Sequence, residues 1–593
     1  MILRPLLSLI PRNTLRAVAV ATMGSLLGCA ATGADVGELR VQANWPDDTM
    51  AKPVDIRDTP SGAYLAGQAA QKAQRYEDAA VFLKKVIAAE PDNADLARQT
   101  FMLLTLEGEF DEAADIAARL VEEGDRSAIS RYVLFLREMK QGRWAEARAE
   151  LTDIPDRSLH LLVGPFMEAW AAVGQGNADA AMAALEPLSK DDNFKATYAF
   201  HAAMVNDLLG LNDAAATFYA EAAASQGGLT LRVVQMYGNF LERHGRRDEA
   251  EIVYNKLLAP NADNSMLVPL SQRLAASDVP APLLQSATDG LAEGLFSVGS
   301  SLRQQGSQDF GLIFGRMALE LRPDFVMARL LVADILERQD RLAEANLVYQ
   351  GIPEDSPFRW SADLNRAQNM ADLGEVEAAA EELEELATSR PERYDALVTL
   401  ANVLRQDEQF EASAKAMDRA IERITEVREE HWRVFYSRGI ALERSKQWAR
   451  AEADFLKALE LQPEQPYVLN YLGYSWVDQG LNIKRATDMI QRAVKLRPND
   501  GAIVDSLGWA LYRVGDFSGA VKQLERAVEL MPHDPTINDH LGDAYWRVGR
   551  QHEARFQWQR ALSLEPAEDL LDIISDKLKN GLNAADSNPA KDG

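Results

Sequence analysis

A period of 34 residues runs through most of this chain and restricts its possible folds more than any other feature. Alanines recur at this interval at Ala79, Ala113, Ala147, Ala181 and Ala215. Nearly the same interval separates later alanines within two further series, Ala345 and Ala379, then Ala451, Ala486, Ala520 and Ala554. Self-similarity at a fixed period of this size indicates a stack of similar supersecondary units, each contacting its neighbours, in place of one globular core.

Two other residue types keep a fixed distance from the repeated alanines. Glycines lie twelve residues before the alanine of their unit, at Gly67, Gly238, Gly439, Gly508 and Gly542. Prolines lie twelve residues after it, at Pro91, Pro391, Pro463, Pro498, Pro532 and Pro566. Glycine inside a helix costs about 1 kcal/mol relative to alanine, so a recurrent glycine needs a packing reason. We expect the glycine of a first helix and the alanine of a second helix to let the two backbones approach closely.

Large side chains open the second helix of many units, at Tyr76, Phe110, Trp144, Phe410, Trp448 and Phe517. Together with the small residues and closing prolines, this pattern resembles the tetratricopeptide repeat. The resemblance implies an all-α fold, a right-handed superhelix of helical hairpins with about fourteen repeats. The units begin near residues 60, 94, 128, 162, 196, 231, 292, 326, 360, 394, 432, 466, 501 and 535.

The repeats divide the chain into an N-terminal array at 60–264 and a C-terminal array at 292–568. Prolines interrupt the pattern at 265–291, which we interpret as a degenerate repeat, with a hinge and a docking insertion as alternatives. Leu570, Leu571, Ile574 and Leu578 fall on one helical face, so residues 569–582 are expected to form a helix capping the last repeat. Residues 583–593 form a polar tail that we expect to be disordered.

The N-terminal residues are typical of an export signal. Arginines are the only charged residues before position 29, and they precede an apolar run at 17–27 that is too short to cross a bilayer. The tetrapeptide Leu26-Leu27-Gly28-Cys29, which contains the only cysteine, resembles the lipobox of bacterial lipoproteins. The alternative is an ordinary cleaved signal with an unrelated cysteine.

The lipobox resemblance implies a signal peptide at 1–28 and an acylated Cys29 as lipid attachment site. In the usual sorting rule of Gram-negative lipoproteins, Ala30 after the cysteine favours the outer membrane, with the protein facing the periplasm. Residues 29–59 are rich in Gly, Asp, Ala and Pro and are expected to form a flexible tether.

Net charge and motifs exclude several classes of function. The formal net charge is −27, and no basic block occurs that would bind nucleic acid. The sequence contains no G-x-S-x-G, H-E-x-x-H or G-x-x-x-x-G-K-[ST] motif. We therefore predict a non-catalytic protein without cofactor or metal, and we expect the seven histidines to lie on the solvated surface.

In tetratricopeptide folds, places 2, 5, 9, 12 and 13 of each unit face the curved inner surface formed by successive first helices. In the last three units these places contain aromatic side chains, arginines and carboxylates, which are typical of interaction hot spots. The predicted partner-binding residues are Asn470, Tyr474, Asp505, Trp509, Tyr512, Arg513, Asp539, Asp543, Trp546 and Arg547. Alternatively, Trp509 and Trp546 only fill space between adjacent first helices. Trp448 and Trp558 are predicted to lie in the core.

Two stretches of the last three repeats are distinctive, NYLGYSWVDQG (470–480) and DSLGWALYRVGDFSGAVKQLERAVELMPHDPTINDHLGDAYWRVGR (505–550). They resemble long outer-membrane tetratricopeptide lipoproteins of Gram-negative bacteria, some of which are adaptors for periplasmic carboxyl-terminal processing proteases. The resemblance implies a scaffold that binds such a protease and its substrates, such as peptidoglycan hydrolases. Alternatives are a scaffold for peptidoglycan synthesis, pilus assembly or polysaccharide export, and an enzyme fused to repeats.

Overall fold

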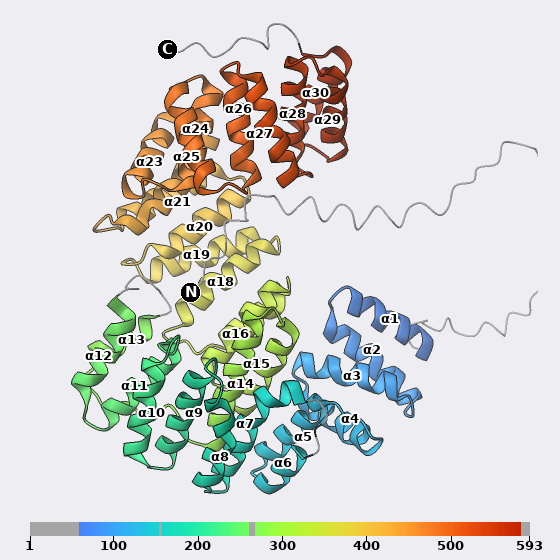
Figure 1. Ribbon diagram of the computed structural model, residues 1–593, viewed down its shortest axis with the longest axis vertical. Helices are drawn as coiled ribbons and strands as arrows, with labels where there is room; N and C mark the ends of the chain where they lie inside the picture. Colours follow the sequence, from blue (N-terminus) through green and yellow to red (C-terminus); the bar gives the residue numbers. More distant parts are fainter. Residues whose placement is uncertain (1–58, 153, 155–156, 260–266, 583–593) are drawn as a thin grey trace, which may run out of the picture. The chain divides into compact units, whose positions relative to one another are not determined.

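The computed structural model describes residues 59–582 except 153, 155–156 and 260–266, and it is drawn in Figure 1. The predicted signal peptide, Cys29, the tether up to residue 58 and the polar tail lie outside the described residues. The chain divides into two compact units, Met1–Gly374 and Glu375–Gly593, and each is described by itself.

The described part of the first unit is built from antiparallel helix pairs. Six pairs precede a single helix: α1 (Pro60–Lys72) with α2 (Tyr76–Ala89), α3 (Ala94–Glu107) with α4 (Phe110–Glu122), α5 (Ala128–Lys140) with α6 (Trp144–Glu150), α7 (Arg157–Gly174) with α8 (Ala178–Ser189), α9 (Lys195–Leu208) with α10 (Asn212–Ala224), and α11 (Leu231–Arg243) with α12 (Arg247–Leu258). The single helix is α13 (Val268–Ala275). Two pairs and one further helix follow: α14 (Ala287–Gln304) with α15 (Gln308–Leu321), α16 (Val326–Arg338) with α17 (Leu342–Gln350), and α18 (Arg359–Asp372).

The second unit continues the pattern and ends in a cap. It contains α19 (Val376–Ser389), α20 (Asp395–Gln406) with α21 (Phe410–Glu422), the 3₁₀ turn η6 (Glu429–His431), α22 (Trp432–Arg444) with α23 (Trp448–Leu461), α24 (Pro466–Gln479) with α25 (Ile483–Leu496), α26 (Gly501–Arg513) with α27 (Phe517–Leu530), α28 (Pro535–Arg547) with α29 (Gln551–Ser563), and α30 (Glu568–Asn580). The predicted all-α repeat solenoid with a C-terminal capping helix is confirmed. Each hairpin begins within five residues of its predicted start.

Local sequence sets the starts of many first helices. Asn93, Asp500 and Asp534 are N-caps whose side chains accept hydrogen bonds from the third backbone amide of the helix, at 3.1, 3.2 and 2.9 Å. Such caps satisfy amides that have no partner inside the helix and stabilise it by roughly 1 kcal/mol. Because these caps recur just before their repeats, they keep the helix boundaries in phase with the 34-residue period.

Most of the repeated glycines of the first helices pack against a larger side chain of the second helix, and Gly473 also lies close to the backbone of Ala486. A Cβ placed on Gly238 would lie 2.1 Å from the ring of Tyr254, and one on Gly542 would lie 2.4 Å from the indole of Trp558. The large residue follows the repeated alanine by four positions, so both lie on the same face of the second helix. The alanines themselves are completely buried, as Ala554 shows.

The described residues of the interruption, 267–291, contain the short helix α13, an irregular stretch and the first turn of α14. From residue 267 onward, α13 lies against the preceding hairpin. Asn239 Nδ2 donates to the Ala281 carbonyl at 2.8 Å, and Arg247 donates to the Leu274 carbonyl at 3.1 Å. The described part of this segment is therefore attached to α11 and α12.

The helices after this interruption pack back against the first repeats of the same unit. Helix α14 contacts α7 and α9, and α15 contacts α3 and α5. Gly290 and Gly294 are one turn apart on α14, and a Cβ there would lie 2.2 Å from Trp170 and 3.0 Å from Phe166. Small residues at this spacing let α14 approach α7 closely. The period alone did not predict this contact.

Two buried charge clusters accompany this packing. Glu293 on α14 is completely buried, and its carboxylate receives a 2.9 Å hydrogen bond from Arg232 Nε on α11. Glu107, at the end of α3, lies 3.3 Å from Arg316 and 2.5 Å from Arg341. Because a buried charge that loses its partner is strongly destabilising, these pairs favour one arrangement of α14 and α15.

The predicted surface position of the histidines is wrong for three of them. His201, His431 and His540 are 0, 6 and 7% exposed. Burial lowers the pKa of His201 to about 3, so this imidazole is neutral among the rings of Phe166, Phe200 and Trp170. Packing against other rings explains the position of His201 better than solvation, and the sequence pattern gave no sign of it.

Candidate functional site

The predicted partner-binding residues lie on three consecutive first helices, α24, α26 and α28. We call the surface formed by α20, α22, α24, α26 and α28 the first-helix surface. The places expected to face it recur every 34 or 35 residues, so each side chain has an equivalent on the neighbouring helix. Contacts between these equivalents determine which side chains remain open to a partner.

Two arginines of the predicted set bridge neighbouring repeats. Arg513 donates to the backbone carbonyl of Asp478 at 3.2 Å, and its guanidinium lies 3.6 Å from the Asp478 carboxylate. Arg547 Nε donates to the hydroxyl of Tyr512 at 3.1 Å. Both bonds join residues 35 positions apart. Arg513 and Arg547 therefore hold adjacent first helices together, in addition to any contact with a partner.

Trp509 lies in the middle of an aromatic stack. Its ring stacks on Tyr512 at 4.9 Å between centroids and on His540 at 4.2 Å. His540 is fixed in turn by Asp505, whose carboxylate lies 2.9 Å from the Nδ1 atom. Burial disfavours the charged imidazole, but the neighbouring carboxylates, Asp505 first among them, raise the pKa of His540 overall. The stack holds the indole rigidly.

Sequence reasoning missed His540 as a member of this site. The available signal was its distance of 35 residues from Asp505, the interval that also separates Tyr512 from Arg547. The indole Nε1 of Trp509 is buried and has no hydrogen-bond partner among the described residues. This donor lacks the hydrogen bond that buried polar groups usually make.

Three of the predicted residues are engaged by the capping helix. Lys577 Nζ on α30 lies 2.7 Å from Asp539 and 2.9 Å from Asp543. Trp546 packs against Gly581, where an added Cβ would lie 2.1 Å from the indole. Burial raises the pKa of Asp543 to about 6, and the nearby Asp539 carboxylate adds to the rise. These side chains attach α30 to the last repeat, a role that the sequence pattern did not indicate.

Two residues on α24 complete the predicted set. Asn470 and Tyr474 are half-buried, and the side-chain oxygen of Asn470 is buried without a hydrogen-bond partner in the described part of the chain. Burial, together with the Asp505 and Asp478 carboxylates, raises the pKa of Tyr474, so its hydroxyl stays protonated. Asn470 thus offers an acceptor on the same surface where Trp509 offers a donor.

The predicted core tryptophans differ in burial. Trp558 is completely buried, and its Nε1 donates to Asp543 at 2.9 Å. Trp448 is only half-buried, because it opens α23 at the edge of the hairpin.

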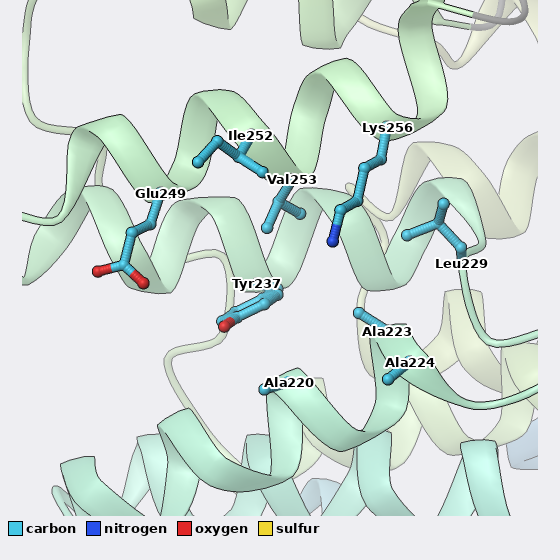
Figure 2. A pocket seen from close by; sticks show the side chains of 9 residues that line it. All are labelled: Ala220, Ala223, Ala224, Leu229, Tyr237, Glu249, Ile252, Val253 and Lys256. Atoms are coloured by element: carbon cyan, nitrogen blue, oxygen red, sulfur yellow. The ribbon is translucent and has the colours of Figure 1, made fainter.

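A pocket of about 210 Å³ lies between α10, α11 and α12 of the first unit, and Figure 2 shows its lining. Ala220, Ala223, Ala224, Leu229, Tyr237, Glu249, Ile252, Val253 and Lys256 line it. Glu249 is bound by Arg246 at 2.7 Å. The pocket lies mainly between two second helices, and most of its lining side chains are apolar.

Among the described residues, no group of three or more His, Cys, Asp or Glu side chains is placed to hold a metal ion. Within the same residues, no helix has the length and apolar character needed to cross a membrane.

Comparison with known families agrees with the helix pairs. The chain matches one model of the Tetratricopeptide repeat over residues 364–427, 398–466 and 506–567, and another over 70–132. The chain carries tetratricopeptide repeats. Repeats of this kind generally present extended surfaces for binding other proteins.

Among curated proteins, this repeat chain is 27% identical over 187 residues to the TPR repeat-containing protein PA4667 of Pseudomonas aeruginosa. That match spans only 31% of either chain. Among solved structures, it aligns with a chain of the APC/C hetero-tetramer Cut9–Hcn1 at 15% identity and a TM-score of 0.38, covering 88% of this chain and 96% of that one. The yeast Tom70 structure aligns at 14% identity and a TM-score of 0.29, with coverages of 88 and 95%.

Proposed function

We propose that this chain is a non-catalytic adaptor whose first-helix surface binds a polypeptide segment of a partner protein. The observation that carries the proposal is Trp509, a rigidly stacked indole with a buried and unpaired N–H among the described residues. A buried polar atom without a partner costs roughly 1–3 kcal/mol. A polypeptide backbone supplies both the carbonyl that Trp509 needs and the amide that Asn470 needs.

We further propose that the adaptor is lipid-anchored in the outer membrane and faces the periplasm. The lipobox-like residues ending in Cys29 support the anchor. The partner we propose is a carboxyl-terminal processing protease with its cell-envelope substrates, such as peptidoglycan hydrolases. The resemblance of 470–480 and 505–550 to adaptors of such proteases supports this assignment.

A crosslinking pull-down from envelope membranes tests both the surface and the partner. The full chain should capture a protease, and Trp509→Ala should reduce its yield at least tenfold, because a central aromatic contributes about 2 kcal/mol or more to binding. Phe556→Ala is the matched control, since Phe556 is 65% exposed on the second helix α29. Unchanged capture by Trp509→Ala would contradict the surface, and a synthase or export complex in place of a protease would contradict the partner.

The anchor is tested by labelling. Wild-type protein made in a Gram-negative host should incorporate a fatty-acid analogue and fractionate with the outer membrane, because acyl chains on one cysteine give stable anchoring. Cys29→Ser should lose both the label and the membrane association. Wild-type protein that remains unlabelled and soluble would refute lipidation.

A further inference from the structure

Arg405, near the end of α20, has a buried nitrogen without a hydrogen-bond partner among the described residues. Arg405 is half-buried, and its Nε is enclosed with no hydrogen-bond partner among the described residues. No ion pair of Arg405 occurs there either, although the chain has 90 acidic and only 63 basic side chains. Since burial of an unpaired charge is unfavourable, this position requires an explanation.

Two tyrosine hydroxyls are the groups that favour the charged form of this guanidinium. Burial lowers the pKa of Arg405, and the only opposing influences come from Tyr436 on α22 and Tyr471 on α24. The two rings meet edge to face at 6.0 Å. Tyr471 donates its hydroxyl to Glu443 at 3.1 Å, whereas the Tyr436 hydroxyl has no hydrogen-bond partner in the described chain. One guanidinium and one phenol are thus left as unused donors.

Arg405 and Tyr436 occupy places of the repeat that face the first-helix surface. Arg405 is at place 12 of the unit beginning at 394, and Tyr436 is at place 5 of the unit beginning at 432. Helices α20 and α22 contact each other directly. The two donors therefore lie on the surface that carries Asn470 and Trp509, in the two repeats that precede Asn470.

Arg438, in the adjacent repeat, is an arginine whose guanidinium is paired with carboxylates. Its Nε lies 2.7 Å from Asp454, and its NH1 lies 2.8 Å from Asp418. Both arginines are half-buried, but only Arg438 has carboxylate partners among the described residues. The missing partner of Arg405 is of the same chemical kind, because a guanidinium binds a carboxylate through parallel hydrogen bonds.

We propose that Arg405 and Tyr436 bind the carboxylate of a Glu or Asp side chain in the polypeptide that occupies the first-helix surface. This rests on the proposed function and specifies the chemistry of the partner: its bound segment is acidic at the point that meets α20 and α22. The carboxylate of the bound segment replaces the water that Arg405 loses on burial. The site therefore discriminates against segments that have Gln or Leu at the position of this acidic residue. The rest of this strongly negative chain repels other acidic peptides.

Selection from a random 12-residue peptide library on the immobilised full chain tests this inference. Displayed peptides have no free carboxyl terminus, so any carboxylate comes from a side chain. Peptides selected on the wild type should share one acidic position, and peptides selected on Arg405→Gln should not. Selected peptides that share no acidic position overturn this inference and leave the proposed function standing. Failure to select any peptide overturns both.

A double-mutant cycle then locates the contact. Replacing the shared Glu of a synthetic, C-terminally amidated peptide by Gln should weaken binding to the wild type about tenfold or more, and should change binding to Arg405→Gln less than about twofold. Equal losses in both proteins overturn the assignment of Arg405. Peptides that bind only with a free terminal carboxylate overturn the assignment to a side chain.

Thermal melting separates this role from a structural one. Arg405→Gln removes an unpaired charge and should leave the melting temperature unchanged or raise it. Arg438→Gln is the matched control and should lower it by several degrees, because Asp418 and Asp454 lose their partner. A comparable loss in Arg405→Gln, with an unchanged peptide preference, would show that Arg405 is a packing residue.

Discussion

At the scale of single residues, several hairpins are closed by a glycine of the first helix and a larger side chain of the second. Gly542 and Trp558 are the most rigid example in the second unit, because the indole is also hydrogen-bonded to Asp543. At Gly67 the nearest atom is a terminal methyl carbon of Leu83 at 2.9 Å, which belongs to a more flexible side chain than an indole. The same pattern of a glycine and a later large residue therefore marks contacts that differ in how easily they accept an added methyl group.

Gly542→Ala should destabilise the second unit. Alanine in a helix gains up to about 1 kcal/mol over glycine, but the added methyl would lie 2.4 Å from Trp558 Nε1. Overpacking of this kind costs roughly 1–3 kcal/mol, so we expect a net loss in chemical denaturation. Gly67→Ala is the control and should be close to neutral. A stabilised Gly542→Ala protein would show that the hairpin yields at this contact.

The cluster around Lys577 predicts that attachment of α30 depends on pH. Burial and Asp539 raise the pKa of Asp543 from 3.8 to about 6, so the folded state retains a proton that the unfolded chain releases. Stability therefore falls as pH rises from about 4 to 6. The raised pKa of His540 acts in the same direction, since its contribution is present below 6.5 and is lost as pH rises through the folded value. Lys577 stays charged throughout.

We therefore expect a higher melting temperature at pH 5 than at pH 8 for the transition that involves α30. Asp543→Asn keeps the shape of the side chain and removes its titration, so the difference between the two pH values should shrink by a few degrees. Circular dichroism of both proteins across this range is the measurement. An identical pH dependence in wild type and variant would exclude Asp543 as its source.

At the scale of helices, the sequence predicts where each helical hairpin begins, but it does not predict contacts between helices that are far apart in sequence. Hairpin starts follow from the period and from caps such as Asp500, whereas the contact of α14 with α7 joins helices far apart in sequence. The four-residue spacing of Gly290 and Gly294 was the available signal, but glycine also recurs inside hairpins and does not name its neighbour. On α30, Leu571 is 45% exposed, although the predicted face includes the completely buried Ile574.

Partner-binding residues were harder to predict than helices for a physical reason. The place rule locates the surface, but it cannot say which side chains are already satisfied. Asp539 and Asp543 are bound by Lys577 from a helix outside the repeats. Arg405 lies at an equally good place without such a partner among the described residues, and the place rule gives no sign of this difference.

Gly290→Leu should disrupt the packing of α14 on α7. The new side chain would begin 2.2 Å from Trp170, which is completely buried and cannot move without displacing its neighbours. We expect a loss of roughly 3 kcal/mol or more in the first unit, at the upper end of overpacking. Gly294→Ala is the matched control, since its Cβ would lie 3.0 Å from Phe166. Equal and small losses in both variants, measured by denaturation, would contradict close helix packing here.

At the scale of the whole molecule, the chain consists of two units that meet in sequence at Gly374 and Glu375. The segment at 265–291 interrupts the repeat pattern, but α14 and α15, which follow the irregular stretch, pack on α3, α5, α7 and α9. Repeat arrays owe their stability mainly to contacts between neighbours, and here long-range contacts add to them. Cooperative unfolding should therefore follow the division at 374 more closely than the interruption in the repeat pattern.

Two fragments distinguish these boundaries. Residues 375–593 contain complete hairpins and the cap, so we expect them to fold alone and to show the same amide protection over 395–563 as in the full chain. Residues 292–593 include the broken α14 and an α15 without Glu107, the partner of Arg316. The backbone amides of segment 292–374 should exchange at least about tenfold faster than in the full chain. The reason is that this fragment lacks α3 and Phe166, which cover this segment in the full chain. Hydrogen exchange with mass spectrometry reads both segments in one experiment. Full protection of 292–374 in the longer fragment would mean that contacts between successive repeats suffice there, and that the packing of α14 on α7 adds little to the stability of the first unit.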